Sequence, residues 1–181
     1  MAGGRFYEVD KLSQVAINLF YGWGYNFYKV ENQLRADDQM VRAKAAWLLG
    51  EAATAVCSAE GDYRREFLPL PTRAKPSADA EAIASAQKLE KLHREISALE
   101  QFIHQLPAPA NDRMTQRYRL EAPTLANLIR LDTLLVGQCD LMRKSVNGAT
   151  AQDILKSLPD LEGGIAAIRA TLHDREAVLM S

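Results

Sequence analysis

Apolar residues recur every three or four positions along almost all of this 181-residue chain, which is the spacing of one face of an α-helix. No segment alternates polar and apolar residues over the length of a strand. The pattern predicts an all-α protein, a bundle of five or six helices with long helices at about 7–36, 39–59, 77–106, 123–146 and 160–180. A chain of this length buries about 70% of its unfolded surface, so we expect a single helical domain over 1–181 without a disulfide or metal staple.

Prolines mark two connections between the predicted helices. Three prolines fall within 67–76, and two more fall within 106–112. Proline lacks an amide hydrogen and restricts the residue before it, so helices are expected to end at these segments. The first segment is also a candidate boundary between helical sub-domains.

The first helical region, about 7–59, is open to two interpretations. Its apolar positions step by three or four from Val9 to Ala59, but Asp37 or Asp38 occupies one place in the series. Either one long helix carries a polar interruption, or Asp38 caps a second helix that begins at Gln39. The sequence narrowly favours the break.

The most regular spacing belongs to the predicted helix at 77–106. We expect Ser77 to be its N-cap, with Asp79 and Glu81 in the first turn, where the helix dipole favours acidic residues. Strict heptad spacing then joins six apolar residues: Leu89, Leu92, Ile96, Leu99, Ile103 and Leu106. Three heptads are too few for a free-standing coiled coil, but they suit a helix within a bundle or an antiparallel hairpin.

Helix signals also divide the C-terminal third of the chain. Pro123 is expected in the first turn of a helix, the alternative being a continuous helix kinked at this proline. Asn147-Gly148 is expected to end that helix, because these residues accept the left-handed cap conformation. The segment from Thr150 to Asp153 resembles a capping box that opens a short helix to about Leu158, and Pro159-Asp160 then starts the last helix.

Aromatic residues are concentrated near the N-terminus, with eight of the thirteen between Phe6 and Tyr28. Helical spacing places Trp23 on the apolar face, together with Phe20 and Phe27, whereas three tyrosines share another face. Tyrosine is enriched at protein interfaces, and the nearby helix-weakening glycines, Gly22 and Gly24, require some offsetting contact. We therefore identify a candidate partner-binding surface: Tyr21, Trp23, Tyr25 and Tyr28. The alternatives are a core layer covered by another helix of the chain and a stacking or ligand pocket.

Local arginine clusters support a second hypothesis, in which the protein is a small helical nucleic-acid-associated subunit. The candidate contacts are Arg64, Arg65, Arg113, Arg117 and Arg119. Arginines can bind phosphates, and an interleaved tyrosine can stack on a base. The same segments also hold acidic residues and the whole chain is nearly neutral, with a formal net charge of -1, so an ordinary solvated face is the competing interpretation.

A third hypothesis is a metal-dependent helical-bundle enzyme. Its weak candidate ligands are Glu90, His93, Glu100 and His104, which share one side of the predicted helix. Glu90 and His93 form the E-x-x-H pair that carboxylate-bridged di-metal bundles use, because residues at i and i+3 can point at one ion. Such a site needs a second E-x-x-H, which the chain lacks, so we expect a solvated charged face, with no metal and no cofactor.

Three further residues are chemically noteworthy but are expected to be structural. Asp132 interrupts an apolar run, so it is either buried and paired, with an arginine as the natural partner, or directed outward. Cys57 and Cys139 lie far apart in sequence without a C-x-x-C motif, and we expect both to be small core residues.

The leading hypothesis is a non-catalytic interaction protein, a subunit, adaptor or scaffold of a larger assembly with a protein partner or a second copy of itself. The phosphate-binding, nucleophile-elbow and zinc-protease motifs are missing, so an enzyme is not expected. The charged N-terminus lacks the apolar region of a secretory signal, and no apolar stretch is long enough to span a bilayer. We therefore expect a cytoplasmic protein without a membrane anchor.

Overall fold

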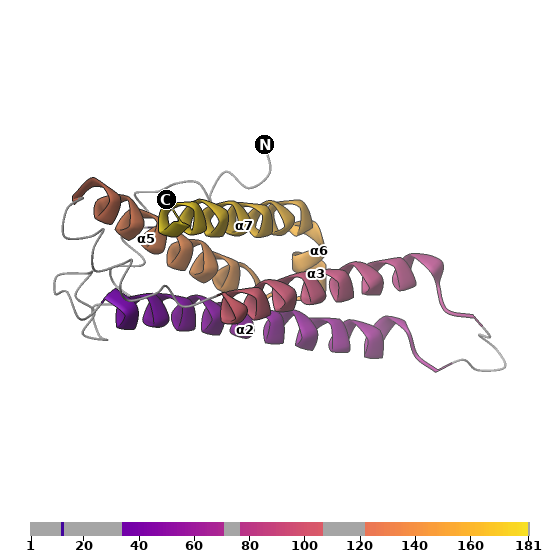
Figure 1. Ribbon diagram of the computed structural model, residues 1–181. Helices are drawn as coiled ribbons and strands as arrows, with labels where there is room; N and C mark the ends of the chain where they lie inside the picture. The colour runs from indigo at the N-terminus through magenta and orange to yellow at the C-terminus, as the bar shows by residue number, and fades with distance from the viewer. Residues whose placement is uncertain (1–11, 13–33, 71–76, 107–121, 181) are drawn as a thin grey trace.

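The computed structural model describes Leu12 and residues 34–70, 77–106 and 122–180. Within these ranges the regular structure is entirely helical, which confirms the predicted all-α bundle (Figure 1). The helices are α2 (Leu34–Phe67), α3 (Ala80–Gln105), α5 (Ala122–Val146), α6 (Ala151–Lys156) and α7 (Leu158–Met180). None of these helices is long and apolar enough to cross a membrane.

The long helices lie roughly along one another (Figure 1). Helix α2 packs against α3 and, on another side, against α5, and α5 in turn packs against α7. The short α6 joins α5 to α7 and also contacts α2 and α3. One continuous apolar core therefore involves all five helices, and α2 contributes more of its buried residues than any other helix does.

Helix α2 runs unbroken from Leu34 to Phe67, so the predicted break with an N-cap at Asp38 is wrong. The helix also continues well past the predicted end at 59. The side chain of Asp38 is buried and forms ion pairs with Arg42 and Arg175. An aspartate inside an apolar series can be a cap or one half of a buried ion pair, and here it is the second.

Helix α3 begins at Ala80, and its N-cap is Asp79 rather than the predicted Ser77. Asp79 has extended backbone angles, φ -65° and ψ 130°, and its side chain accepts a hydrogen bond from the amide of Glu81 at 3.4 Å. The heptad prediction is confirmed, because five of its six residues are buried: Leu89, Leu92, Ile96, Leu99 and Ile103. Leu106 follows as the half-buried C-cap residue.

The remaining helix ends follow the sequence signals closely. Pro123 is the second residue of α5, as expected for a proline in a first turn. Helix α5 ends at Val146, and Gly148 then adopts a left-handed φ of 73°. The Thr150–Asp153 capping box is present and opens α6, which ends at Lys156. Helix α7 begins at Leu158, slightly before the predicted start at 160.

Candidate interaction surfaces

The predicted aromatic surface, Tyr21, Trp23, Tyr25 and Tyr28, lies outside the described residues, as do Arg113, Arg117 and Arg119. One residue of the same N-terminal region is described, namely Leu12. It is helical and only 5% exposed.

Leu12 lies directly on Gly137 of α5. A Cβ atom added to Gly137 would lie 2.6 Å from the carbonyl oxygen of Leu12 and 2.7 Å from its Cβ. Cβ atoms in proteins do not come this close to atoms of another residue. The absence of a side chain at Gly137 is therefore what admits Leu12 to this position. Leu12 belongs to the apolar stripe read from the sequence, so this member of the stripe faces the bundle.

Buried charges join four segments at one end of the bundle. The Nε of Arg175, on α7, donates to Asp132 of α5 at 2.5 Å, and its Nη2 donates to Asp38 of α2 at 2.5 Å. Arg42 forms a second ion pair with Asp38 at 2.9 Å and donates to the carbonyl of Leu106 at the end of α3. Of the two alternatives left open for Asp132, the structure shows the buried carboxylate paired with an arginine. Two carboxylates and two guanidinium groups balance in charge, as burial requires.

A second group of charges lies between α2 and α5. Asp140 is buried and accepts hydrogen bonds from Arg143, the closer at 2.8 Å, and its other oxygen lies 2.7 Å from Nζ of Lys144. Lys44 of α2 is nearby, and its Nζ lies 4.1 Å from the ring centre of Trp47. Burial, and secondly repulsion by Arg143, lower the pKa of Lys44, whereas Asp140 opposes this shift. The ammonium group of Lys44 therefore lies over one face of the Trp47 ring.

A groove runs along the outer side of α2, where this helix adjoins α3, and Trp47 is the first α2 residue that lines it. The groove measures about 740 Å³, and α2 lines it with small residues, including Gly50, Cys57 and Gly61. Trp47 itself is 51% exposed. The carboxylate of Glu100, from α3, lies above Gly50, since a Cβ there would be 3.1 Å from its Oε1.

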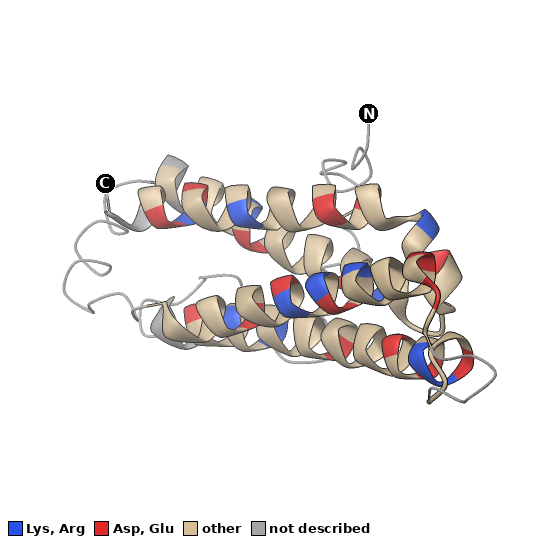
Figure 2. Ribbon diagram, turned by 90° about the vertical axis from the view of Figure 1, so that its right-hand side faces the viewer, with Lys and Arg blue, Asp and Glu red and all other residues tan. Residues whose placement is uncertain are grey.

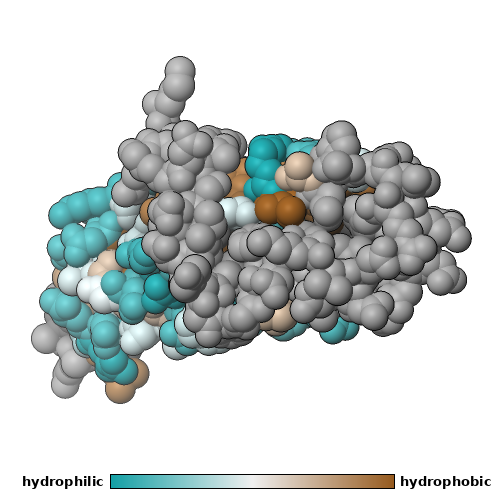
Figure 3. All heavy atoms as spheres, turned by 90° about the vertical axis from the view of Figure 1, so that its left-hand side faces the viewer, coloured by the Kyte–Doolittle hydropathy of each residue, from teal (hydrophilic) through white to brown (hydrophobic). Residues whose placement is uncertain are grey.

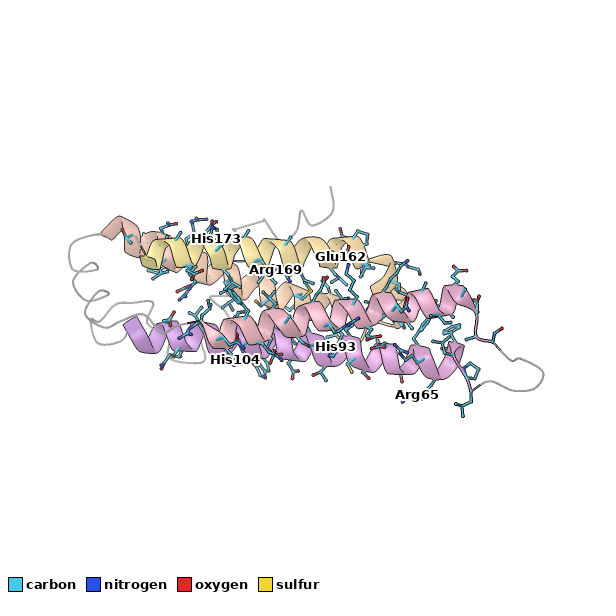
Figure 4. All side chains as sticks on the ribbon, turned by 45° about the vertical axis from the view of Figure 1, so that its right-hand side comes forward. Arg65, His93, His104, Glu162, Arg169 and His173 are labelled. Atoms are coloured by element: carbon cyan, nitrogen blue, oxygen red, sulfur yellow. The ribbon has the colours of Figure 1, made fainter. Side chains whose placement is uncertain are left out.

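The predicted metal-ligand candidates follow the α2-facing side of α3. Glu90 pairs with Arg64 of α2 at 3.0 Å and with Arg94 at 3.5 Å. His93 lies 3.4 Å from the hydroxyl of Ser97. His93 and Glu100 line the groove, whereas His104 is exposed (Figure 4). Among the described residues no group of three or more His, Cys, Asp or Glu side chains is arranged to hold a metal ion.

The two described arginines of the nucleic-acid hypothesis are engaged by acidic neighbours. Arg64 pairs with Glu60 at 2.6 Å and with Glu90 at 3.0 Å, and the hydrogen bond to Glu60 is the main reason that the pKa of Arg64 is raised. Arg65 pairs with Asp62 one turn earlier. Figure 2 shows the same mixture more widely, with basic and acidic residues interspersed along the visible helices.

A second groove separates α3 from α7. It measures about 430 Å³ and is lined by Ala98, Leu99, Phe102, Arg169, His173 and Glu176. Phe102 is 47% exposed, and a salt bridge between Lys91 and Glu162, at 3.4 Å, joins the same two helices elsewhere along their length. Figure 3 views the molecule from the left-hand side of Figure 1 and shows a small apolar area next to strongly hydrophilic residues.

The predictions for the two cysteines have different outcomes. Cys139 is buried in α5, as expected, but Cys57 is exposed and lines the α2–α3 groove, so its assignment to the core is wrong. Cys57 belongs to the groove-lining side of α2, next to the buried residues Val56 and Ala59. The sequence also did not single out Trp47 or Phe102, because a helical aromatic residue is ordinarily assigned to the core.

Comparison of the chain with known protein families, with curated proteins and with solved structures gave no match.

Proposed function

We propose that this protein is a non-catalytic helical interaction protein, a subunit, adaptor or scaffold that binds a protein partner through the tyrosine face Tyr21, Tyr25 and Tyr28. The observation that supports this most directly is the contact between Leu12 and Gly137. This contact supports the proposal because it places Leu12, one member of the apolar stripe, against α5.

The helical repeat, counted from Leu12, separates the aromatic residues into two groups. With 3.6 residues per turn, Tyr21, Tyr25 and Tyr28 fall about 160° to 220° around the helix axis from Leu12. Trp23 falls at about 20°, close to the face of Leu12. This spacing predicts that the tyrosines are directed away from α5 and that Trp23 belongs to the apolar face. We therefore base the proposal on the three tyrosines of the four-residue surface.

Exposed aromatic side chains in the described residues give independent support. Trp47 and Phe102 are each about half exposed, and each borders a groove between two helices. Aromatic residues are over-represented at protein interfaces because they bring a large apolar area with few rotatable bonds. By contrast, the acidic partners of Arg64 and Arg65 favour a protein ligand over the nucleic-acid alternative.

The test compares a triple variant, Y21A/Y25A/Y28A, with the matched variant Trp23→Ala. Native co-purification with mass spectrometry identifies the proteins bound by the wild-type chain, and the triple variant is expected to lose them while keeping wild-type helicity and melting temperature. Trp23→Ala is expected to lower the melting temperature. If the triple variant unfolds as Trp23→Ala does, the tyrosines are core residues and the proposal fails. Retention on nucleic acid that falls steeply with salt would instead support the arginine alternative.

A further inference from the structure

Gly61 occupies a position in α2 where glycine has no described structural role. It lies within a continuous helix, and apart from its chain neighbours and the nearby backbone of its own helix, no atom of the described residues lies within 4 Å of the place where a Cβ would be. Glycine destabilises a helix by about 1 kcal/mol relative to alanine. A small residue at an open site of this kind is useful where another backbone approaches closely.

Gly61 belongs to a line of residues along the outer face of α2. The line consists of Trp47, Glu51, Thr54, Ser58, Gly61 and Arg65, all of which border the α2–α3 groove. Their spacing, 4-3-4-3-4, is that of a helix packing seam. The spacing reads the same from either end, with its centre at position 56. A second copy of the line, running antiparallel, can therefore lie on the first in matching register.

The charges along this line are self-complementary in the antiparallel direction. Glu51 lies near the Trp47 end, where the carboxylate of Glu100 also lies, and Arg65 marks the opposite end. Turning one copy end to end places Arg65 of each chain beside Trp47 and Glu51 of the other. Arginine can then pair with a carboxylate and stack on the side of the indole that Lys44 leaves uncovered. A parallel pair would instead place like charges together.

The centre of the line is small enough for close packing. Thr54 would lie opposite Ser58, and Glu51 opposite Gly61, so no bulky side chain separates the two helices at the centre. Arg65 forms an exposed pair with Asp62, whose side chain is 67% exposed while that of Arg65 is 77% exposed. Exposed ion pairs contribute little to stability, so Arg65 can exchange this partner.

We propose that the outer face of α2, from Trp47 to Arg65, is a two-fold interface through which two copies of this chain associate antiparallel. The inference does not depend on the tyrosine face and concerns a different surface. The seam is about 27 Å long, which makes a small interface, so the dimer is expected to dissociate on dilution.

The first test is sedimentation equilibrium of the full chain over a range of concentrations. Arg65→Glu and Glu51→Arg should each weaken the dimer, because each makes both symmetric contacts repulsive. An equal mixture of the two variants should form a heterodimer tighter than either homodimer, since both contacts are then attractive. Arg94→Glu, which changes an exposed arginine outside the groove, is the matched control and should not alter association.

The second test uses substitutions with opposite effects on folding and association. Gly61→Ala should raise the melting temperature of the dilute monomer and weaken the dimer, whereas a role confined to folding would leave association unchanged.

Cys57 lies close to the two-fold axis, so a short bismaleimide should cross-link wild-type chains through it, and Cys57→Ser should abolish this product. The Y21A/Y25A/Y28A variant should dimerise as the wild type does.

The proposal is overturned if the chain is monomeric at all concentrations, or if the charge-reversed mixture associates no more tightly than its components. It is also overturned if dimers form but Gly61→Ala and Arg65→Glu leave them unchanged, since the interface then lies elsewhere.

Discussion

Arg175 of α7 donates to Asp132 of α5, 43 positions earlier in the chain, at a heavy-atom distance of 2.5 Å, and both side chains are almost completely buried. The same guanidinium reaches Asp38 of α2, so one arginine links three helices. Each of these groups would be costly to bury alone, and together they fix how the helices meet at this end of the bundle.

Removing Arg175 should be far more damaging than removing the interaction as a whole. Arg175→Met leaves two buried carboxylates without their shared partner, and we expect the free energy of unfolding to fall by about 3–5 kcal/mol. The double variant D132N/R175M removes the Asp132–Arg175 pair and keeps Asp38 paired with Arg42, so it should be more stable than R175M alone. Urea unfolding measures the free energy of unfolding of both variants. Arg169→Met, on the exposed side of the same helix, is the control and should change this free energy by no more than about 0.5 kcal/mol. A double variant no more stable than R175M would contradict this account.

The heptad seam of α3 predicts a contrast between two isoleucines on one helix. Ile96 is fully buried, whereas Ile83 is 40% exposed. Ile96→Ala should lower the free energy of unfolding by about 2–5 kcal/mol, because it removes buried apolar surface and leaves a cavity. Ile83→Ala should change it by no more than about 0.5 kcal/mol. Equal losses in denaturant unfolding would show that the seam does not form the core.

The contact between Gly137 and Leu12 can be tested with a single methyl group. Gly137→Ala places a Cβ against the backbone of Leu12, and overpacking of this kind costs about 1–3 kcal/mol. Gly50→Ala is the matched control, because the atoms nearest to its new Cβ all belong to the end of the flexible Glu100 side chain. Thermal unfolding should therefore separate the two variants. If Gly137→Ala is as stable as Gly50→Ala, Leu12 does not hold its position on α5.

The fold was largely predictable because its signals are local. The heptad residues of α3, the proline in the first turn of α5 and the Thr150–Asp153 capping box act within a few residues of each other. Asp38 shows where local reasoning fails. Arg42, one of its two partners, lies one turn along the same helix, but Arg175, the other, lies 137 positions away, and no spacing in the sequence joins that residue to Asp38.

The candidate surfaces were less predictable for a related reason. Whether Trp47 or Cys57 is exposed depends on how much of the α2 surface α3 and α5 cover, and that depends on the angles between helices. The groove is lined by residues of both helices, and the placement of Glu100 over Gly50 is a pairing that no spacing within either helix specifies. The tyrosine segment lies outside the described residues, so its prediction still rests mainly on helical spacing.

The capping box of α6 predicts a measurable titration. Hydrogen bonds from the Thr150 side chain and amide lower the pKa of Asp153 below its ordinary value of 3.8. A carboxylate with a depressed pKa contributes stability above its unfolded pKa, and this contribution is lost as the pH falls through the folded pKa. NMR titration should show the low value in the wild type and a rise toward 3.8 in Thr150→Val. Thr54→Val, whose hydroxyl bonds only within α2, should leave the Asp153 titration unchanged.

The two cysteines should differ sharply in reactivity toward a thiol reagent. Cys57 is exposed, whereas Cys139 is buried and its pKa is raised by burial and by the neighbouring Asp140. Because the thiolate is the reactive form, native protein should label one thiol per chain quickly, and fully denatured protein should label both. Exposure of Cys139 requires an opening that costs about 5 kcal/mol or more if it is global, so its labelling should be slower by about a thousandfold or more.

Cys57→Ser separates the two thiols in this experiment. The variant should lose the fast labelling phase completely and keep the slow one. The rate of that slow phase should rise in R175M, because loss of the buried arginine weakens the packing around α5. Two equally fast thiols in the native wild type would contradict the placement of Cys139 in the core, and with it the packing of α5 against α2.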